Sequence, residues 1–208
     1  MEEQINEIKK EIKKSLRLAM NGVVSTLQRR QGLNYKINFG VEIPRIKEIA
    51  TRYGKSKQLA KALWQEDIRE CRIIAILVMP VEEFTTDEAN EWIATIAFTE
   101  LADQLSMHLL SKMANGIEDA INRIQSTESI TAYCGFMSLA HLLRKSAILS
   151  KEQQRIYIEA TENTICNNSD ACTYVKQSAR NTFAIFAESS QADREEIDKH
   201  STLKELFA

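Results

Sequence analysis

Apolar positions recur along the chain with the period of an α-helix. In the first stretch, steps of three or four residues separate Ile5, Ile8, Ile12, Leu16, Ala19 and Val23. A helix turns once in 3.6 residues, so this spacing gathers the apolar side chains on one face. The pattern predicts an amphipathic helix over residues 2–30.

Turn residues divide the rest of the sequence into further helices. A connector over residues 34–39 closes at Gly40, and Pro44 suits the first turn of the next helix. Ser150 with Gln153 forms a capping box. The helices expected after the first cover residues 44–53, 57–64, 67–79, 85–96, 98–113, 117–126, 130–149, 150–165 and 174–186.

Four of these helices are predicted to lie in the core, and those over residues 67–79 and 130–149 are apolar on most sides. The four begin near residues 67, 99, 130 and 170, and an amphipathic helix precedes each. Alternating helix pairs at intervals of roughly 30 to 45 residues are typical of HEAT-like solenoids. The fold class predicted is all-α, a right-handed α-α superhelix (solenoid) of HEAT-like helical repeats. The alternative is an irregular helical bundle.

Composition agrees with a globular helical protein. The 208 residues include only six Gly and two Pro, 44% are hydrophobic and 27% are charged. The net charge of −2 argues against a uniformly basic nucleic-acid binder. Residues 188–208 carry three basic and six acidic side chains. We expect a single HEAT-like repeat domain over residues 1–187, followed by an acidic tail or terminal helix over 188–208.

Other function classes have little support in the sequence. The four Cys form no Cys-x-x-Cys pair and the three His are isolated, so we expect reduced thiols and no metal site. Phosphate-binding glycine loops are absent, which argues against a nucleotide cofactor; no other cofactor is expected. With no signal peptide and no apolar run near 18 residues, we expect a cytoplasmic protein without a membrane partner.

One stretch carries a family resemblance. Residues 40–50 read Gly-Val-Glu-Ile-Pro-Arg-Ile-Lys-Glu-Ile-Ala, and Leu-Trp-Gln-Glu follows at 63–66, with Glu70-Cys71-Arg72 and Ala75 beyond it. In order and spacing this resembles the HEAT-like repeat DNA glycosylases of the bacterial DNA alkylation repair family (AlkD-like). The likeness is specific over residues 38–112. After residue 115 it is mainly a likeness of helix layout.

The resemblance implies a concave helical face that grips duplex DNA carrying an N3- or N7-alkylated purine. Such a lesion is cationic, so its base is already a good leaving group. A carboxylate beside the sugar would stabilise the positive charge developing there and position water. The partner expected is therefore duplex DNA, alkylated or structurally distorted.

The family's site residues carry over only in part. Its Trp-Asp-x-x-Asp stretch falls on residues 99–103, which makes Asp103 the candidate catalytic carboxylate and keeps an acid at Glu100. Thr99 replaces the aromatic residue, although Phe98 is adjacent. The alternative reading of Asp103 is a structural bond to a neighbouring helix.

A second family element, Phe-Trp-x-Arg-Arg, falls near residues 132–136. Tyr133 keeps an aromatic ring there, but no arginine is present. A later functional tryptophan position falls near Asn181. Three of four site positions therefore depart from the family pattern, which leaves enzyme activity open.

The remaining charged residues have two readings each. The candidate DNA-binding cations on second-helix positions are Lys112, Arg144, Lys145, Lys176 and Arg180. Their alternative role is that of scattered surface charges. We expect Glu70 and Arg72 to form a structural ion pair, Trp64 and Trp92 to pack in the core, and His108 and His141 to be part-buried.

Three function classes follow. The leading hypothesis is a DNA-binding repair protein that excises cationic alkylpurines with Asp103. The second is a non-catalytic protein that binds DNA of unusual structure. The third is a protein-interaction scaffold, which the acidic tail would suit.

Overall fold

A computed structural model describes residues 2–167, 171–189, 192, 194–200 and 203. The regular elements of these residues are helices, and one isolated β-bridge joins Ile37 to Ile68. The chain divides into two compact units, Met1–Glu88 and Ala89–Ala208. The sequence-based boundary at residue 187 stays a prediction.

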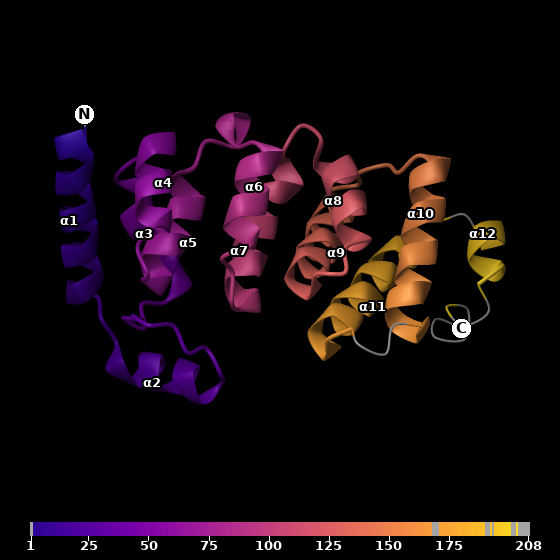
Figure 1. The fold of residues 1–208 in the computed structure, drawn as a ribbon, viewed down its shortest axis with the longest axis horizontal. Helices are drawn as coiled ribbons and strands as arrows, with labels where there is room; N and C mark the ends of the chain where they lie inside the picture. The colour runs from indigo at the N-terminus through magenta and orange to yellow at the C-terminus, as the bar shows by residue number, and fades with distance from the viewer. Residues whose placement is uncertain (1, 168–170, 190–191, 193, 201–202, 204–208) are drawn as a thin grey trace. The chain divides into compact units, whose positions relative to one another are not determined.

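The first unit is built from short helices that pack around α5. α4 packs along α5, α3 also lies against α5, and α1 contacts all three (Figure 1). The elements are α1 (Glu2–Leu18), α2 (Gly22–Arg30), α3 (Ile43–Thr51), α4 (Lys57–Trp64), α5 (Arg69–Val78), the 3-10 turn η1 (Val81–Glu83) and α6 (Thr86–Ile93), which spans the division between the units.

The single helix predicted over residues 2–30 is wrong, because the chain breaks at residues 19–21. The side chain of Asn21 caps α2 by accepting hydrogen bonds from the backbone N–H groups of Val23 and Val24 at 3.1 and 3.2 Å. An Asn at this position favours a helix start over a helix interior. Val23 continues the apolar period in sequence, yet it is 80% exposed.

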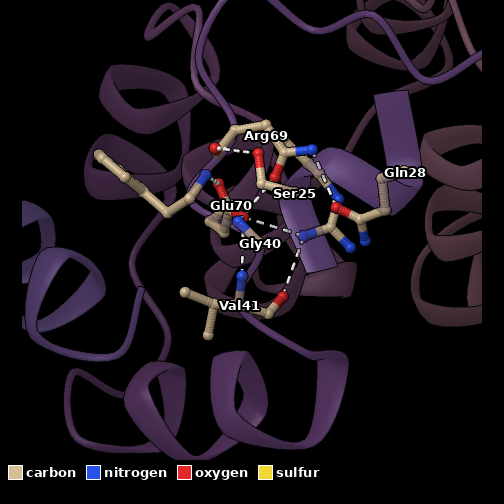
Figure 2. A network of polar contacts seen from close by, with 8 residues as sticks. Ser25, Gln28, Gly40, Val41, Arg69 and Glu70 are labelled. Atoms are coloured by element: carbon tan, nitrogen blue, oxygen red, sulfur yellow. Dashed lines mark hydrogen bonds and ion pairs between the residues drawn. The ribbon is translucent and has the colours of Figure 1, made fainter. Parts of the chain in front are cut away.

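A buried polar network joins α5 to the connector before α3 (Figure 2). The carboxylate of Glu70 accepts hydrogen bonds from the backbone N–H groups of Phe39 and Val41, both at 3.2 Å. Arg69 Nη1 donates to the Val41 carbonyl and to Glu70 Oε1, both at 3.0 Å. The expected Glu70–Arg72 pair is therefore wrong, since Glu70 pairs with Arg69. The Arg72 guanidinium lies over the Trp64 ring, 5.5 Å from its centroid.

The same network holds α2, which has no buried residue of its own. Ser25 Oγ donates to the Asn38 carbonyl at 2.9 Å, and the Asn38 amide donates to Gln28 Oε1 at 2.9 Å. Gly40 has φ of +69°, and its N–H donates to Asn38 Oδ1 at 2.8 Å. A Cβ at Gly40 would collide with the Asn21 carbonyl, so both the backbone conformation and the space require glycine. Polar contacts, not a buried apolar face, therefore position α2.

The second unit contains the remaining helices. They are α7 (Thr99–His108), the 3-10 turn η2 (Leu110–Lys112), α8 (Gly116–Ile124), α9 (Ser129–Leu143), α10 (Lys151–Glu162), the π-helical turn η3 (Asn163–Asn167), α11 (Thr173–Glu188) and α12 (Arg194–Asp198). The segment 188–208 includes α12, and its residues 190, 191, 193, 201, 202 and 204–208 lie outside the described part of the chain. The predicted helix over 98–113 ends earlier, because the backbone leaves the helical region at Leu109.

The helices of this unit form two rows, with α7, α9 and α11 in one and α8 and α10 in the other (Figure 1). α9 contacts α7 on one side and α11 on the other, while α8 packs on α9 and also touches α10 (Figure 1). Ser106 of α7 donates to the Cys134 carbonyl of α9 at 3.3 Å, and Thr182 of α11 donates to the Phe136 carbonyl at 3.1 Å. Residue numbers rise together in these contacts, in the one between Asp103 and Tyr133, and in the ring contact between Tyr133 and Tyr174, so the three helices run parallel. They are the core helices predicted near residues 99, 130 and 170.

A buried ion pair on α8 also bonds this helix to α6. Arg123 donates to both carboxylate oxygens of Asp119, at 2.6 and 2.9 Å, and to Asn90 Oδ1 of α6 at 2.9 Å. Both charged residues are about 5% exposed or less. The sequence analysis did not single out this pair, whose i, i+4 spacing is the available signal. No helix in the described residues has the length and apolar character needed to cross a membrane.

Candidate functional site

The site is built around Asp103, one turn into α7. Its side chain is half-buried, and its Oδ1 accepts a hydrogen bond of 2.8 Å from the hydroxyl of Tyr133 on α9. The two residues are 30 positions apart in sequence. The parallel packing of α7 on α9 brings the two side chains into contact.

Burial raises the pKa of the Asp103 carboxyl, and the nearby acid Glu100 raises it further, while the hydrogen bond from Tyr133 lowers it in part. The net effect is a pKa raised above the ordinary aspartate value of 3.8. The pKa of Tyr133 is raised as well, first by burial and then by the hydrogen bond to Asp103. The proton therefore stays on the phenol, and Tyr133 is the donor in this pair.

The Asp103 carboxylate is held by a neutral hydrogen-bond donor and not by a cation. In the described residues its hydrogen-bond partner is the neutral Tyr133, and no Lys, Arg or His forms an ion pair with it. When it is ionised, a partly desolvated carboxylate without a counter-cation acts through a medium of lowered dielectric, so its negative charge is weakly screened. Such a group can stabilise a positive charge that develops close to it.

A second tyrosine completes the site from α11. The rings of Tyr133 and Tyr174 meet edge to face, with centroids 5.4 Å apart and an interplanar angle of 78°. Tyr133 is 9% exposed and Tyr174 is 37% exposed, so Tyr174 is the one that presents a ring to solvent. The sequence analysis did not select Tyr174. Its signal is its place in the first turn of α11, where the parallel register sets it beside Tyr133.

The other residues named for this site lie at the start of α7. Phe98 is the N-cap residue and Thr99 begins the helix, and both are half-buried. Tyr133 is the aromatic residue whose contact with Asp103 the structure defines.

The candidate cations lie in three groups. Arg144 and Lys145 are exposed just beyond the C-terminal end of α9, about 16 Å along the helix axis from Tyr133 at 1.5 Å per residue. They lie close enough to His141 to act on it: burial first, and then these two cations, lower the pKa of His141. This basic group is thus separated from Asp103 along α9.

The other cations lie on neighbouring helices of the same row. Lys176 and Arg180 are half-buried and one turn apart on α11. They come two and six residues after Tyr174, so they lie on a different side of the helix from its ring. Lys112 is exposed in the 3-10 turn after α7. The α11 pair therefore lies nearest the level of Tyr133, and Lys112 lies toward the other end of α7. The structure distributes the five cations along the row of α7, α9 and α11.

The sequence matches a family model described as DNA alkylation repair enzyme over residues 4–168. The chain belongs to this family. The resemblance that the sequence motifs carry is thereby confirmed. The family match includes Asp103 and Tyr133, whereas Tyr174, Lys176 and Arg180 lie beyond its last residue.

A solved structure shares the fold. It is described as a new family of proteins related to the HEAT-like repeat DNA glycosylases with affinity for branched DNA structures. The two chains are 18% identical, the TM-score is 0.79, and the match covers 96% of this chain and 83% of the other. The predicted fold class, an all-α array of HEAT-like repeats, is confirmed. A search of curated proteins gave no match.

Proposed function

We propose that this family member binds DNA on the face formed by α7, α9 and α11 and excises cationic N3- or N7-alkylpurines. The observation that carries the proposal is the state of Asp103, a half-buried carboxylate held by a neutral donor and not paired with a cation. Its negative charge is available to a cationic partner. An alkylated purine nucleotide, whose sugar becomes positively charged as the base leaves, is a partner of that kind.

In the proposed reaction the bond between the sugar C1′ and the purine nitrogen breaks, and its electron pair leaves with the base. The alkylpurine departs neutral because it carried a positive charge in the nucleotide. The positive charge passes to the sugar, where the Asp103 carboxylate stabilises it. Water adds to C1′ and loses one proton to solvent, with Asp103 orienting the water through its second oxygen.

The cations of the row supply the proposed DNA contacts. Lys176 and Arg180 on α11, and Arg144 and Lys145 beyond the end of α9, would contact phosphates of the duplex. Contacts of this kind release counterions, so binding should weaken as the salt concentration rises. The overall charge of −2 makes these local groups, not the whole protein, the source of the attraction.

A second candidate function is binding of branched DNA without catalysis. Two observations favour it. The similar solved protein is described by its affinity for branched DNA structures. Thr99 also stands where the resemblance calls for an aromatic residue, and no arginine stands near Tyr133 in residues 132–136.

Release of 7-methylguanine and 3-methyladenine from methylated duplex DNA tests the first candidate. The variant Asp103→Asn should lose release, while Glu118→Gln, which removes an exposed acid on α8, should keep it. An absence of release from the wild-type protein would reject the glycosylase proposal. Equal release from wild type and Asp103→Asn would reject the role of Asp103.

Binding to a duplex and to a four-way junction, each at two salt concentrations, separates the remaining candidates. Tighter, salt-sensitive binding to the junction with no base release would favour the second function. The double variant Lys176→Ala/Arg180→Ala should weaken binding, and Lys151→Ala, an exposed cation on α10, should not. If neither DNA is bound, the protein-interaction alternative is left.

A further inference from the structure

The contacts around Asp103 link side chains from three successive core helices. Asp103 comes from α7, Tyr133 from α9 and Tyr174 from α11. The hydrogen bond of 2.8 Å joins the first two, and the edge-to-face ring contact joins the second two. These contacts form because α7, α9 and α11 run parallel, so they depend on how the three helices pack around Asp103.

We propose that Tyr133 is a positioning residue, which fixes the orientation and the ionised form of Asp103 through its hydroxyl. The part of this inference that concerns catalysis rests on the proposed glycosylase function. The part that concerns the carboxylate itself does not.

The geometry gives Tyr133 the means to act on Asp103. Its ring is 9% exposed, so little water competes for the hydroxyl. The edge contact with Tyr174 restricts rotation of the ring. A carboxylate that accepts one fixed hydrogen bond at Oδ1 has its second oxygen aimed in a defined direction. That oxygen is the one left to meet a sugar or a water molecule.

The charges around Asp103 explain why a phenol suits this position. On its own helix Asp103 faces Glu100, which disfavours its ionised form. On α9 it faces Tyr133 and the buried Cys134, and burial raises the pKa of that thiol to about 12, so it is neutral at pH 7. Tyr174 on α11 is also an uncharged phenol, because its pKa is raised, first by burial. The hydrogen bond from Tyr133 is therefore the favourable contact that keeps Asp103 ionised, and it does so without cancelling the negative charge.

Removing the hydroxyl should make Asp103 harder to ionise. Burial and Glu100 would then act on the carboxyl without the opposing hydrogen bond, and its pKa would rise further. Because the reaction needs the ionised form, the fall of the rate on the acid side of the pH profile (its acid limb) should shift to higher pH. A structural role alone would lower stability but leave this limb where it is.

The test compares wild type with Tyr133→Phe, Tyr174→Phe and Tyr53→Phe. Tyr133→Phe keeps the ring and its contact with Tyr174, so the fold is expected to survive. Tyr174→Phe keeps the ring contact as well, and Tyr53→Phe removes a phenol from the first unit. The first measurement is the titration of the Asp103 carboxyl carbon by NMR, assigned with Asp103→Asn. The second is the rate of 7-methylguanine release from methylated duplex DNA between pH 4.5 and 8.

We expect the NMR midpoint of Asp103 to rise in Tyr133→Phe and to stay unchanged in the other two variants. Release by Tyr133→Phe should fall roughly tenfold at the acid end, the factor expected for one lost hydrogen bond to a charged group, and should recover in part as the pH rises. An unchanged midpoint in Tyr133→Phe would overturn the inference. A raised midpoint in a protein that releases no base would uphold the link between Tyr133 and Asp103 and reject the glycosylase function alone.

Discussion

Arg69 and Glu70, neighbours in sequence, form an ion pair of 3.0 Å in which the side chains are 1% and 0% exposed. The pair also satisfies three backbone groups of the connector, the N–H groups of Phe39 and Val41 and the carbonyl of Val41. Removing Glu70 leaves the Arg69 charge buried and takes the acceptor from the two backbone donors. Such losses cost several kcal/mol.

Glu70→Ala should therefore lower the free energy of unfolding by roughly 3–5 kcal/mol, the range for breaking a buried pair. Urea denaturation of the whole chain measures the change in midpoint. The control is Glu152→Ala, which breaks the exposed pair of 2.7 Å with Arg155 and should cost less than about 1 kcal/mol. Equal costs for the two variants would contradict the structural role of the buried network.

Gly135 lies at a close approach of α9 to α8. A Cβ at this position would lie 2.6 Å from the backbone nitrogen of Ile124 and 2.9 Å from the carbonyl oxygen of Ala120. Both atoms belong to backbone, so α8 and α9 would have to move apart. Gly135→Ala should destabilise the protein by roughly 1–3 kcal/mol despite the better helix propensity of alanine.

Thermal unfolding of Gly135→Ala beside Gly22→Ala provides the check. Nothing lies within 4 Å of a Cβ at Gly22 in α2, so alanine there should be neutral or slightly stabilising. A Gly135→Ala protein as stable as wild type would show that the two helices can separate at little cost.

Glu88 should make the stability of the first unit depend on pH. Burial alone would raise its pKa, but hydrogen bonds from Lys57, the Thr85 backbone and Lys61 outweigh burial and lower the pKa to about 2. A lowered pKa in the folded state means that ionised Glu88 stabilises folding above its usual pKa of 4.5, and that this contribution is lost as the pH falls toward 2. Glu88→Gln should cost roughly 1–2 kcal/mol at pH 7 and little near pH 2. Urea midpoints at both values measure this, and a cost that does not depend on pH would argue against the charge as its cause.

Asp103→Asn should make the protein more stable at neutral pH. The pKa of Asp103 is raised in the folded state, mainly by burial, so its ionisation opposes folding once the pH exceeds the usual carboxyl range. Asparagine carries no charge and can still accept the hydrogen bond from Tyr133. We expect the melting temperature at pH 7 to rise by about 1–3 °C, with the gain shrinking as the pH falls toward the usual carboxyl pKa of 3.8. A lower melting temperature would indicate that the charge of Asp103 stabilises the fold.

Sequence alone determined which segments are core helices and which acid to test. Residues 67–79 and 130–149 are apolar on most sides, and burial against several neighbours leaves that pattern in the sequence itself. The start of α6 was equally readable, because Thr85 and Glu88 form a local cap. Asp103 could be selected because the family motif is a short continuous stretch. These features depend on residues close together in the chain.

Tertiary structure decided which of these residues meet. Glu70 pairs with Arg69 and not with Arg72, because Arg69 and Glu70 both bond the connector at Val41, whereas Arg72 lies over the Trp64 ring. The break at Asn21 depends on its cap and on the bond between its N–H and the Phe39 carbonyl, 18 residues away. Asp103, Tyr133 and Tyr174 come together only through the parallel register of α7, α9 and α11. Apolar periodicity gives the face of each helix that is buried, but the packing of one helix on the next sets the level at which their polar side chains meet.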